Sequence, residues 1–184
     1  MDARVLDPFH RLFFPREVNM DGNVRHHYDR SVDDVLALVT DPDFLKRRAE
    51  AAGEKSVVVR VDRDGARMTI RLERDVESSL PGFMKKLFNP TNHLVDSQTW
   101  DTSGQVKTSD WSVEVAGQKR VQIRGRLSLA PASSGGCDYI EAFTVSVAIP
   151  LVGGRIEKYV LGETESSIRQ QFDFTVKELG SRGA

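Results

Sequence analysis

Apolar residues near the C-terminus recur at every fourth position, which is close to the repeat of one helix face. The stripe runs through Val152, Ile156, Val160, Thr164, Ile168, Phe172 and Val176. Charged residues such as Arg155, Glu165 and Lys177 fall between its members. The pattern predicts a helix of roughly 25 residues with one buried face. At 1.5 Å per residue such a helix is about 37 Å long, enough to cross a sheet.

Upstream of this helix, apolar and polar residues alternate with a period of two, as in half-buried strands. Asp64 and Gly65 form a dipeptide typical of hairpin turns, so residues 55–76 are expected to form two antiparallel strands. The same alternation predicts strands over residues 23–31, 91–102, 105–115, 120–131 and 137–150. Pro81, Gly82 and Pro90 indicate an irregular or short helical crossing over residues 79–90.

Two short helices are predicted between the first strand and the hairpin. Ser31 is a typical N-cap residue, and Asp34 three positions later completes an acidic variant of the capping box, so a helix is expected over residues 32–40. Asp41 followed by Pro42 predicts the start of a second helix, and Gly53 its end.

The order of these elements predicts an α+β helix-grip fold. A curved antiparallel sheet of seven strands wraps around the long C-terminal helix, with two short helices after strand 1. We expect one domain over residues 23–180, preceded by an N-terminal arm over residues 1–22. Leu6, Phe9 and Phe13 have helical spacing in this arm, which is interpreted either as an amphipathic lid or docking element, or as a packed or partly disordered extension.

Three segments resemble the START/Bet v 1-like (SRPBCC) superfamily: YDRSVDDVLALVTDPDF (28–44), SQTWD (97–101) and above all IPLVGGRIEKYV (149–160). Within it, the spacing is most similar to a family of unknown function found mainly in actinobacteria. The superfamily includes lipid and hormone carriers, aromatase/cyclases, hydroxylase domains and chaperone regulators. The resemblance therefore implies a fold rather than a chemistry.

Composition narrows the class of partner. The chain has 26 Lys and Arg against 27 Asp and Glu, so no basic excess favours nucleic acid or an anionic membrane. No apolar run is long enough to span a bilayer, and no signal peptide is visible, so an integral membrane segment is not expected. The single Cys137 excludes an internal disulfide and fits a reducing compartment, which favours a cytoplasmic location. The sequence leaves the oligomeric state open.

Gly153 and Gly154 stand where the long helix is expected to begin, although glycine is a poor helix former. We interpret the pair as structural. The glycines would let the chain turn sharply, with a positive φ, and would let the first helical turn pass close to the sheet. An anion-binding loop is the alternative, but the lysine and hydroxyl residue of a phosphate loop do not follow.

The stripe of the long helix weakens at Thr164, with Gly162, Ser166 and Ser167 nearby. Small and polar residues leave volume unfilled, so a cavity is expected between sheet and helix, although a large side chain such as Phe143 or a tryptophan could fill it. Trp100 and Trp111 share one face of the sheet only if their hairpin loop has an even length. The residues predicted to bind a ligand are Met68, Ile70, Leu72, Asp96, Gln98, Trp100, Trp111, Val113, Ile123, Leu127, Glu141, Phe143, Val145, Ile156, Val160, Thr164 and Ile168.

No catalytic residue, metal ligand or cofactor site is predicted. Adjacent His26 and His27 point to opposite faces of a strand and cannot easily share a metal, and the sequence has no nucleophile elbow, zinc-protease or dinucleotide motif. The hypothesis favoured by the sequence is non-catalytic binding of a hydrophobic or amphipathic small molecule of lipid, polyketide or isoprenoid type. The alternatives are a cyclase-like or hydrolytic enzyme that uses Asp96 or Glu141, and an interaction domain with a filled core.

Overall fold

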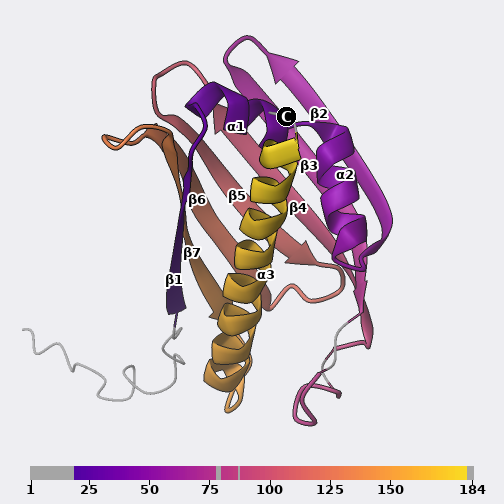
Figure 1. Ribbon diagram of the computed structural model, residues 1–184. Coiled ribbons are helices and arrows are strands. Elements are labelled where there is room, and N and C mark those ends of the chain that lie inside the picture. The colour runs from indigo at the N-terminus through magenta and orange to yellow at the C-terminus, as the bar shows by residue number, and fades with distance from the viewer. Residues whose placement is uncertain (1–18, 78–79, 87, 182–184) are drawn as a thin grey trace, which may run out of the picture.

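The computed structural model describes residues 19–77, 80–86 and 88–181 (Figure 1). The helical turn expected around Leu6 and Phe13 lies outside these residues. The strands are β1 (Asn19–Tyr28), β2 (Lys55–Asp64), β3 (Arg67–Glu77), β4 (Thr91–Asp101), β5 (Lys107–Val115), β6 (Val121–Pro131) and β7 (Cys137–Val147). The helices are α1 (Val32–Val39), α2 (Pro42–Ala51) and α3 (Gly153–Ser181).

The seven strands form one antiparallel sheet in the order β1-β7-β6-β5-β4-β3-β2. The sheet curves around α3, which lies along its concave face, while α1 and α2 cover the end where α3 finishes (Figure 1). Arg47 on α2 pairs with Glu178 on α3 at 2.9 Å and fixes this end. The helix-grip fold expected from the sequence is therefore confirmed.

The two short helices begin at the predicted caps. The Asp34 backbone N–H donates to the Ser31 hydroxyl at 3.1 Å, and that hydroxyl donates to the Asp34 carboxylate at 2.6 Å. The Phe44 N–H donates to the Asp41 carboxylate at 2.6 Å, with Pro42 at the first helical position. Each cap satisfies an amide that the helix itself leaves without an acceptor.

The strand β1 starts earlier than the sequence pattern indicated. Residues 19–22, assigned above to the arm, pair with β7, with Asn19 opposite Ser146 and Gly22 opposite Phe143. Alternation within so short a segment is weak, and its partner is more than a hundred residues away in the sequence. Pairing with a distant strand is what extends β1 here.

The buried face of α3 differs in part from the predicted stripe. Ile156, Ile168 and Phe172 are buried as expected, but Val176 is 45% exposed. A repeat of four residues advances 400° on a helix of 3.6 residues per turn, so the stripe drifts by about 40° at each step. Near the end of α3 the face toward the sheet is instead supplied by Thr175 and Leu179.

The glycine pair does only part of what was expected. Neither glycine has a positive φ; the sharp turn after β7 is made by Leu151, with a φ of 68°. Gly153 does lie against the sheet, since a Cβ atom there would lie 2.6 Å from the Val147 carbonyl oxygen, whereas Gly154 faces open space. The prediction of close approach is correct for Gly153, and the prediction of a positive φ is wrong for both.

This difference gives a matched test of the helix start. Gly153→Ala is expected to lower the free energy of unfolding by about 1–3 kcal/mol, because the added methyl group overpacks against β7. Gly154→Ala is expected to raise it by about 0.5–1 kcal/mol, because alanine favours the helix and meets no neighbour. Urea unfolding of both variants measures the two effects, and changes of the same sign would contradict this account of the turn.

Candidate functional site

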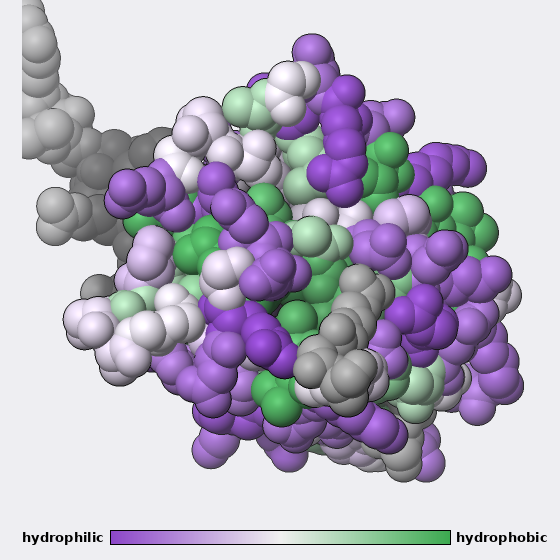
Figure 2. Space-filling view, turned by 45° about the horizontal axis from the view of Figure 1, so that its top comes forward, coloured by the Kyte–Doolittle hydropathy of each residue, from purple (hydrophilic) through white to green (hydrophobic). Residues whose placement is uncertain are grey.

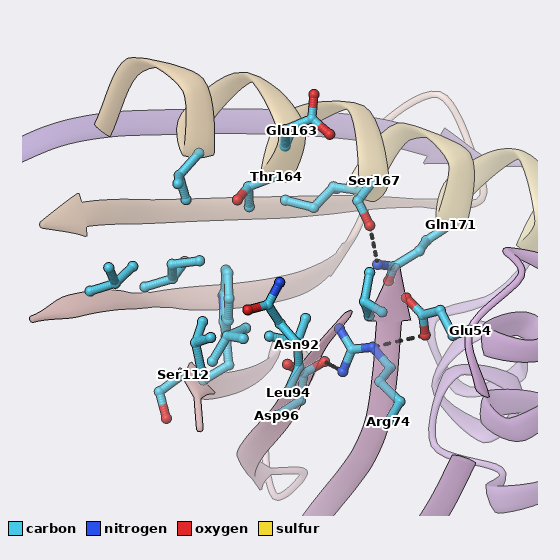
Figure 3. A pocket seen from close by; sticks show the side chains of 18 of the residues that line it. Glu54, Arg74, Asn92, Leu94, Asp96, Ser112, Glu163, Thr164, Ser167 and Gln171 are labelled. Atoms are coloured by element: carbon cyan, nitrogen blue, oxygen red, sulfur yellow. Dashed lines mark hydrogen bonds and ion pairs between the residues drawn. The ribbon is translucent and has the colours of Figure 1, made fainter. Parts of the chain in front are cut away.

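A cavity of about 270 Å³ lies between the concave face of the sheet and α3. This volume is close to the lower end of the roughly 300–1,000 Å³ usual for small-molecule sites. Strands β3 to β7 form its floor, α3 its roof, and the ends of α1 and α2 one side (Figure 3). Leu80, Met84 and Phe88 from the crossing between β3 and β4 close another side. The surface in Figure 2 is mostly hydrophilic, with apolar side chains in small groups.

The structure brings ten of the predicted ligand-binding residues to the cavity wall. They are Asp96, Gln98, Trp111, Val113, Ile123, Leu127, Glu141, Val160, Thr164 and Ile168. The other seven predicted residues lie in the buried core but do not line the cavity: Met68, Ile70, Leu72, Trp100, Phe143, Val145 and Ile156. Alternation identifies the face of a strand, but not the positions along it where packing leaves space.

Both tryptophans lie on the concave face. Gln98 on β4 is paired with Trp111 on β5, and Trp100 with Ser109, so the even loop length required above holds. The Trp100 indole N–H donates to the Gln98 side-chain oxygen at 2.9 Å and is fully enclosed. The Trp111 indole packs on Phe143 with ring centroids 5.9 Å apart, and its N–H has no partner among the described residues.

A buried ionic cluster, missed by the sequence analysis, borders the cavity. The Arg74 side chain on β3 pairs with Glu54 through Nε at 2.8 Å and with Asp96 through Nη1 at 2.7 Å (Figure 3). Burial favours loss of its proton, but the attraction of Asp96 and Glu54 outweighs this and raises the pKa of Arg74. A second hollow of about 120 Å³ between α2 and α3 shares this cluster with the cavity.

Local signals for Arg74, and for Arg48, which also lines the cavity, were present in the sequence. Arg74 continues the inward phase of Met68, Ile70 and Leu72, so it is a charge on an otherwise apolar strand face. Arg48 follows Phe44 by four positions and therefore shares the buried face of α2. A charged residue at a position where the pattern places apolar residues is expected to be buried and to need a counter-ion or a ligand, and that rule would have identified both Arg74 and Arg48.

Glu141 on β7 has the most strongly displaced acid–base equilibrium of the carboxylates that line the cavity. Burial raises the pKa of its side chain from 4.5 to about 8, against the opposing attraction of Arg48 and with a further increase from Asp96. Burial also raises the pKa of Tyr139 well above 10. Both groups are therefore protonated near neutral pH, and both face the cavity as hydrogen-bond donors.

The described residues hold no group of three or more His, Cys, Asp or Glu side chains placed to bind a metal. His26 lies on the Phe172 ring at 5.1 Å, whereas His27 contacts Asp138 at 3.2 Å on the outer face. Cys137 is the first residue of β7 and is buried, and burial raises the pKa of its thiol to about 11. It is therefore a poor nucleophile. Within the described residues, no helix is long and apolar enough to cross a membrane.

A family model described as "Protein of unknown function (DUF2505)" matches residues 23–179. The chain belongs to this family. An uncharacterized protein of Mycobacterium tuberculosis strain H37Rv is 27% identical over 157 residues, which cover 79% of this chain and 86% of the relative. An uncharacterized protein of Mycobacterium bovis matches to the same extent.

Solved structures with the same architecture show that this DUF2505 chain has a Bet v 1-type fold. The Zhui aromatase/cyclase from Streptomyces sp. R1128 superimposes with a TM-score of 0.62 at 11% identity, covering 90% of this chain and 96% of that one. A norcoclaurine synthase mutant from Thalictrum flavum, in complex with a transition-state analogue, superimposes with a TM-score of 0.59 at 13% identity. The match covers 93% of this chain and 100% of that one. A protein from Thermus thermophilus superimposes with a TM-score of 0.63 at 16% identity, covering 90% of this chain and 100% of that one.

Proposed function

We propose that the protein binds a hydrophobic or amphipathic small molecule, of lipid, polyketide or isoprenoid type, in the cavity beneath α3 and leaves it chemically unchanged. The cavity carries the proposal, because apolar and aromatic side chains form the larger part of its wall, and four of its charged residues gather at the end next to α2: Arg48, Glu54, Arg74 and Asp96. This is the usual composition of a small-molecule site, where apolar area supplies affinity and a few polar groups fix orientation. The solved neighbours with the same fold include a norcoclaurine synthase bound to a transition-state analogue.

Filling the cavity tests the proposal. Thr164 lines the cavity from α3, so Thr164→Trp is expected to occupy it and to weaken binding of the neutral fluorophore N-phenyl-1-naphthylamine at least tenfold. Glu165→Trp places the same side chain at a neighbouring, half-buried position that does not line the cavity, and this variant should bind the fluorophore as the unmodified protein does. Fluorescence titration and thermal melting would be recorded for all three. Equal binding by both variants would contradict the proposed site.

The raised pKa of Glu141 favours a second candidate function, a cyclase-like or hydrolytic enzyme in which this carboxyl transfers a proton. Asp96 is less suited, because its Oδ2 is held by Arg74 at 2.7 Å. Mass spectrometry of the ligand that the protein carries out of its own host separates the two functions. A carrier should yield the same ligand from Glu141→Gln, whereas an enzyme should yield a different molecule, its unconverted substrate.

A further inference from the structure

We propose that the ligand is an amphipathic carboxylic acid whose carboxylate binds at the end of the cavity formed by Arg48, Tyr139 and Glu141. This subsite, called here the carboxylate subsite, rests on the function proposed above and specifies the chemical class of the ligand. No residue in it is required to change the ligand chemically.

Arg48 is the first observation behind the carboxylate subsite. Its side chain lines both the cavity and the adjoining hollow between α2 and α3. Its neighbour Arg47 pairs with Glu178 at 2.9 Å, and Arg74 pairs with two carboxylates. Among the described residues, no carboxylate lies within ion-pair distance of Arg48, whose guanidinium instead lies 5.8 Å from the centre of the Phe44 ring. Arg48 is therefore a partly buried guanidinium at the cavity wall that lacks the carboxylate partner that Arg47 and Arg74 each have.

Tyr139 and Glu141 supply further donors at the same place. Both residues interact electrostatically with Arg48, and both line the cavity. Tyr139 is only 8% exposed, and burial, together with nearby Glu141, raises the pKa of its hydroxyl, which therefore keeps its proton and can donate. With Glu141 protonated, all three groups can donate. Several enclosed donors that face one space favour a ligand group that accepts hydrogen bonds.

The distribution of charge favours a carboxylate among the possible acceptors. Glu54 and Asp96 both contact Arg74, so the one positive charge of Arg48 has no anion in direct contact. A guanidinium binds a carboxylate through two parallel hydrogen bonds, which an alcohol cannot reproduce. A phosphate dianion would bring a second negative charge close to Glu54 and Asp96. The apolar remainder of the wall, including Val121, Val160 and Met84, fits the hydrocarbon part of the ligand.

Matched probes test the carboxylate subsite. Decanoic acid and 1-decanol have the same chain and would each displace N-phenyl-1-naphthylamine from the full-length protein at pH 7. We expect the acid to bind about ten- to a hundredfold more tightly than the alcohol. Arg48→Met should remove this preference, because it should lower the affinity for the acid and leave the affinity for the alcohol unchanged. Arg47→Met, which changes the adjacent arginine on the outside of α2, should retain the full preference.

A second variant keeps the test decisive if Arg48→Met does not fold. Tyr139→Phe preserves the ring, whose centroid lies 5.3 Å from that of Phe172, and removes only the hydroxyl. It should therefore lower the affinity for the acid several-fold and leave the affinity for the alcohol unchanged. Equal affinity of the unmodified protein for acid and alcohol would overturn the carboxylate subsite while leaving the binding function in place. Failure of the fluorophore and of both probes to bind would overturn the binding function itself.

Discussion

Arg74→Met is expected to lower the free energy of unfolding by about 3–5 kcal/mol, because it leaves the Glu54 and Asp96 carboxylates enclosed without their cation. The three side chains are only 9%, 16% and 18% exposed, so water does little to replace the lost charge. Urea unfolding at pH 7 measures the effect. Arg71→Met is the matched control on the same strand; Arg71 pairs with Glu73 at 2.9 Å on the exposed face and should contribute less than about 1 kcal/mol.

A combined variant tests whether the cost arises from unpaired charge or from lost packing. Adding Glu54→Gln and Asp96→Asn to Arg74→Met removes the two negative charges at nearly constant volume, and should recover most of the lost stability. No recovery would mean that the arginine acts mainly through its hydrocarbon stem. An Arg74→Met effect no larger than that of Arg71→Met would contradict the importance assigned to the cluster.

Glu141→Gln is expected to make the protein more stable than the unmodified chain at alkaline pH. The folded state raises the pKa of Glu141 from 4.5 to about 8, so folding retains a proton that the unfolded chain releases within this range. The contribution of Glu141 to stability is complete below about pH 4.5 and is lost as pH rises through about 8. Since one pKa unit corresponds to about 1.4 kcal/mol, the variant should be more stable by up to about 5 kcal/mol at pH 9.

The measurement is a series of urea unfolding curves at pH 5, 7 and 9. Glu165→Gln, at a half-buried position on α3 that does not line the cavity, controls for the general effect of removing one carboxylate. A difference between Glu141→Gln and the unmodified protein that stays constant across this range would show that Glu141 does not keep its proton in the folded state.

Much of the fold could be predicted because the relevant signals are local. The caps at Ser31 and Asp41 and the turn at Asp64–Gly65 each depend on a few adjacent residues, and all three appear where expected. The alternation also showed which residues of each strand face the interior. Every predicted ligand-binding residue accordingly lies on the cavity wall or in the buried core. Whether these residues bind a ligand stays a prediction.

The ionic cluster could not be assembled in this way, because its members meet only in three dimensions. Glu54 lies between α2 and β2, and Arg74 and Asp96 lie on neighbouring strands. Their contact depends on how α2 packs over the edge of the sheet, which no short stretch of sequence encodes. The same limit applies to the division of the predicted site between cavity wall and solid core.

The crossing between β3 and β4 has a consequence for how relatives of this protein can diverge. Each strand of the cavity floor is held by a hydrogen-bonded neighbour on both sides, so a change of cavity length there would require a new register across the sheet. Met84 and Phe88 close the cavity from a segment whose described residues form no such ladder. Insertions, deletions and changes of side-chain size at this segment can therefore lengthen or shorten the space for a ligand while the fold stays the same. In an alignment of relatives, we expect differences in ligand size to correlate with residues 80–88 rather than with the strands.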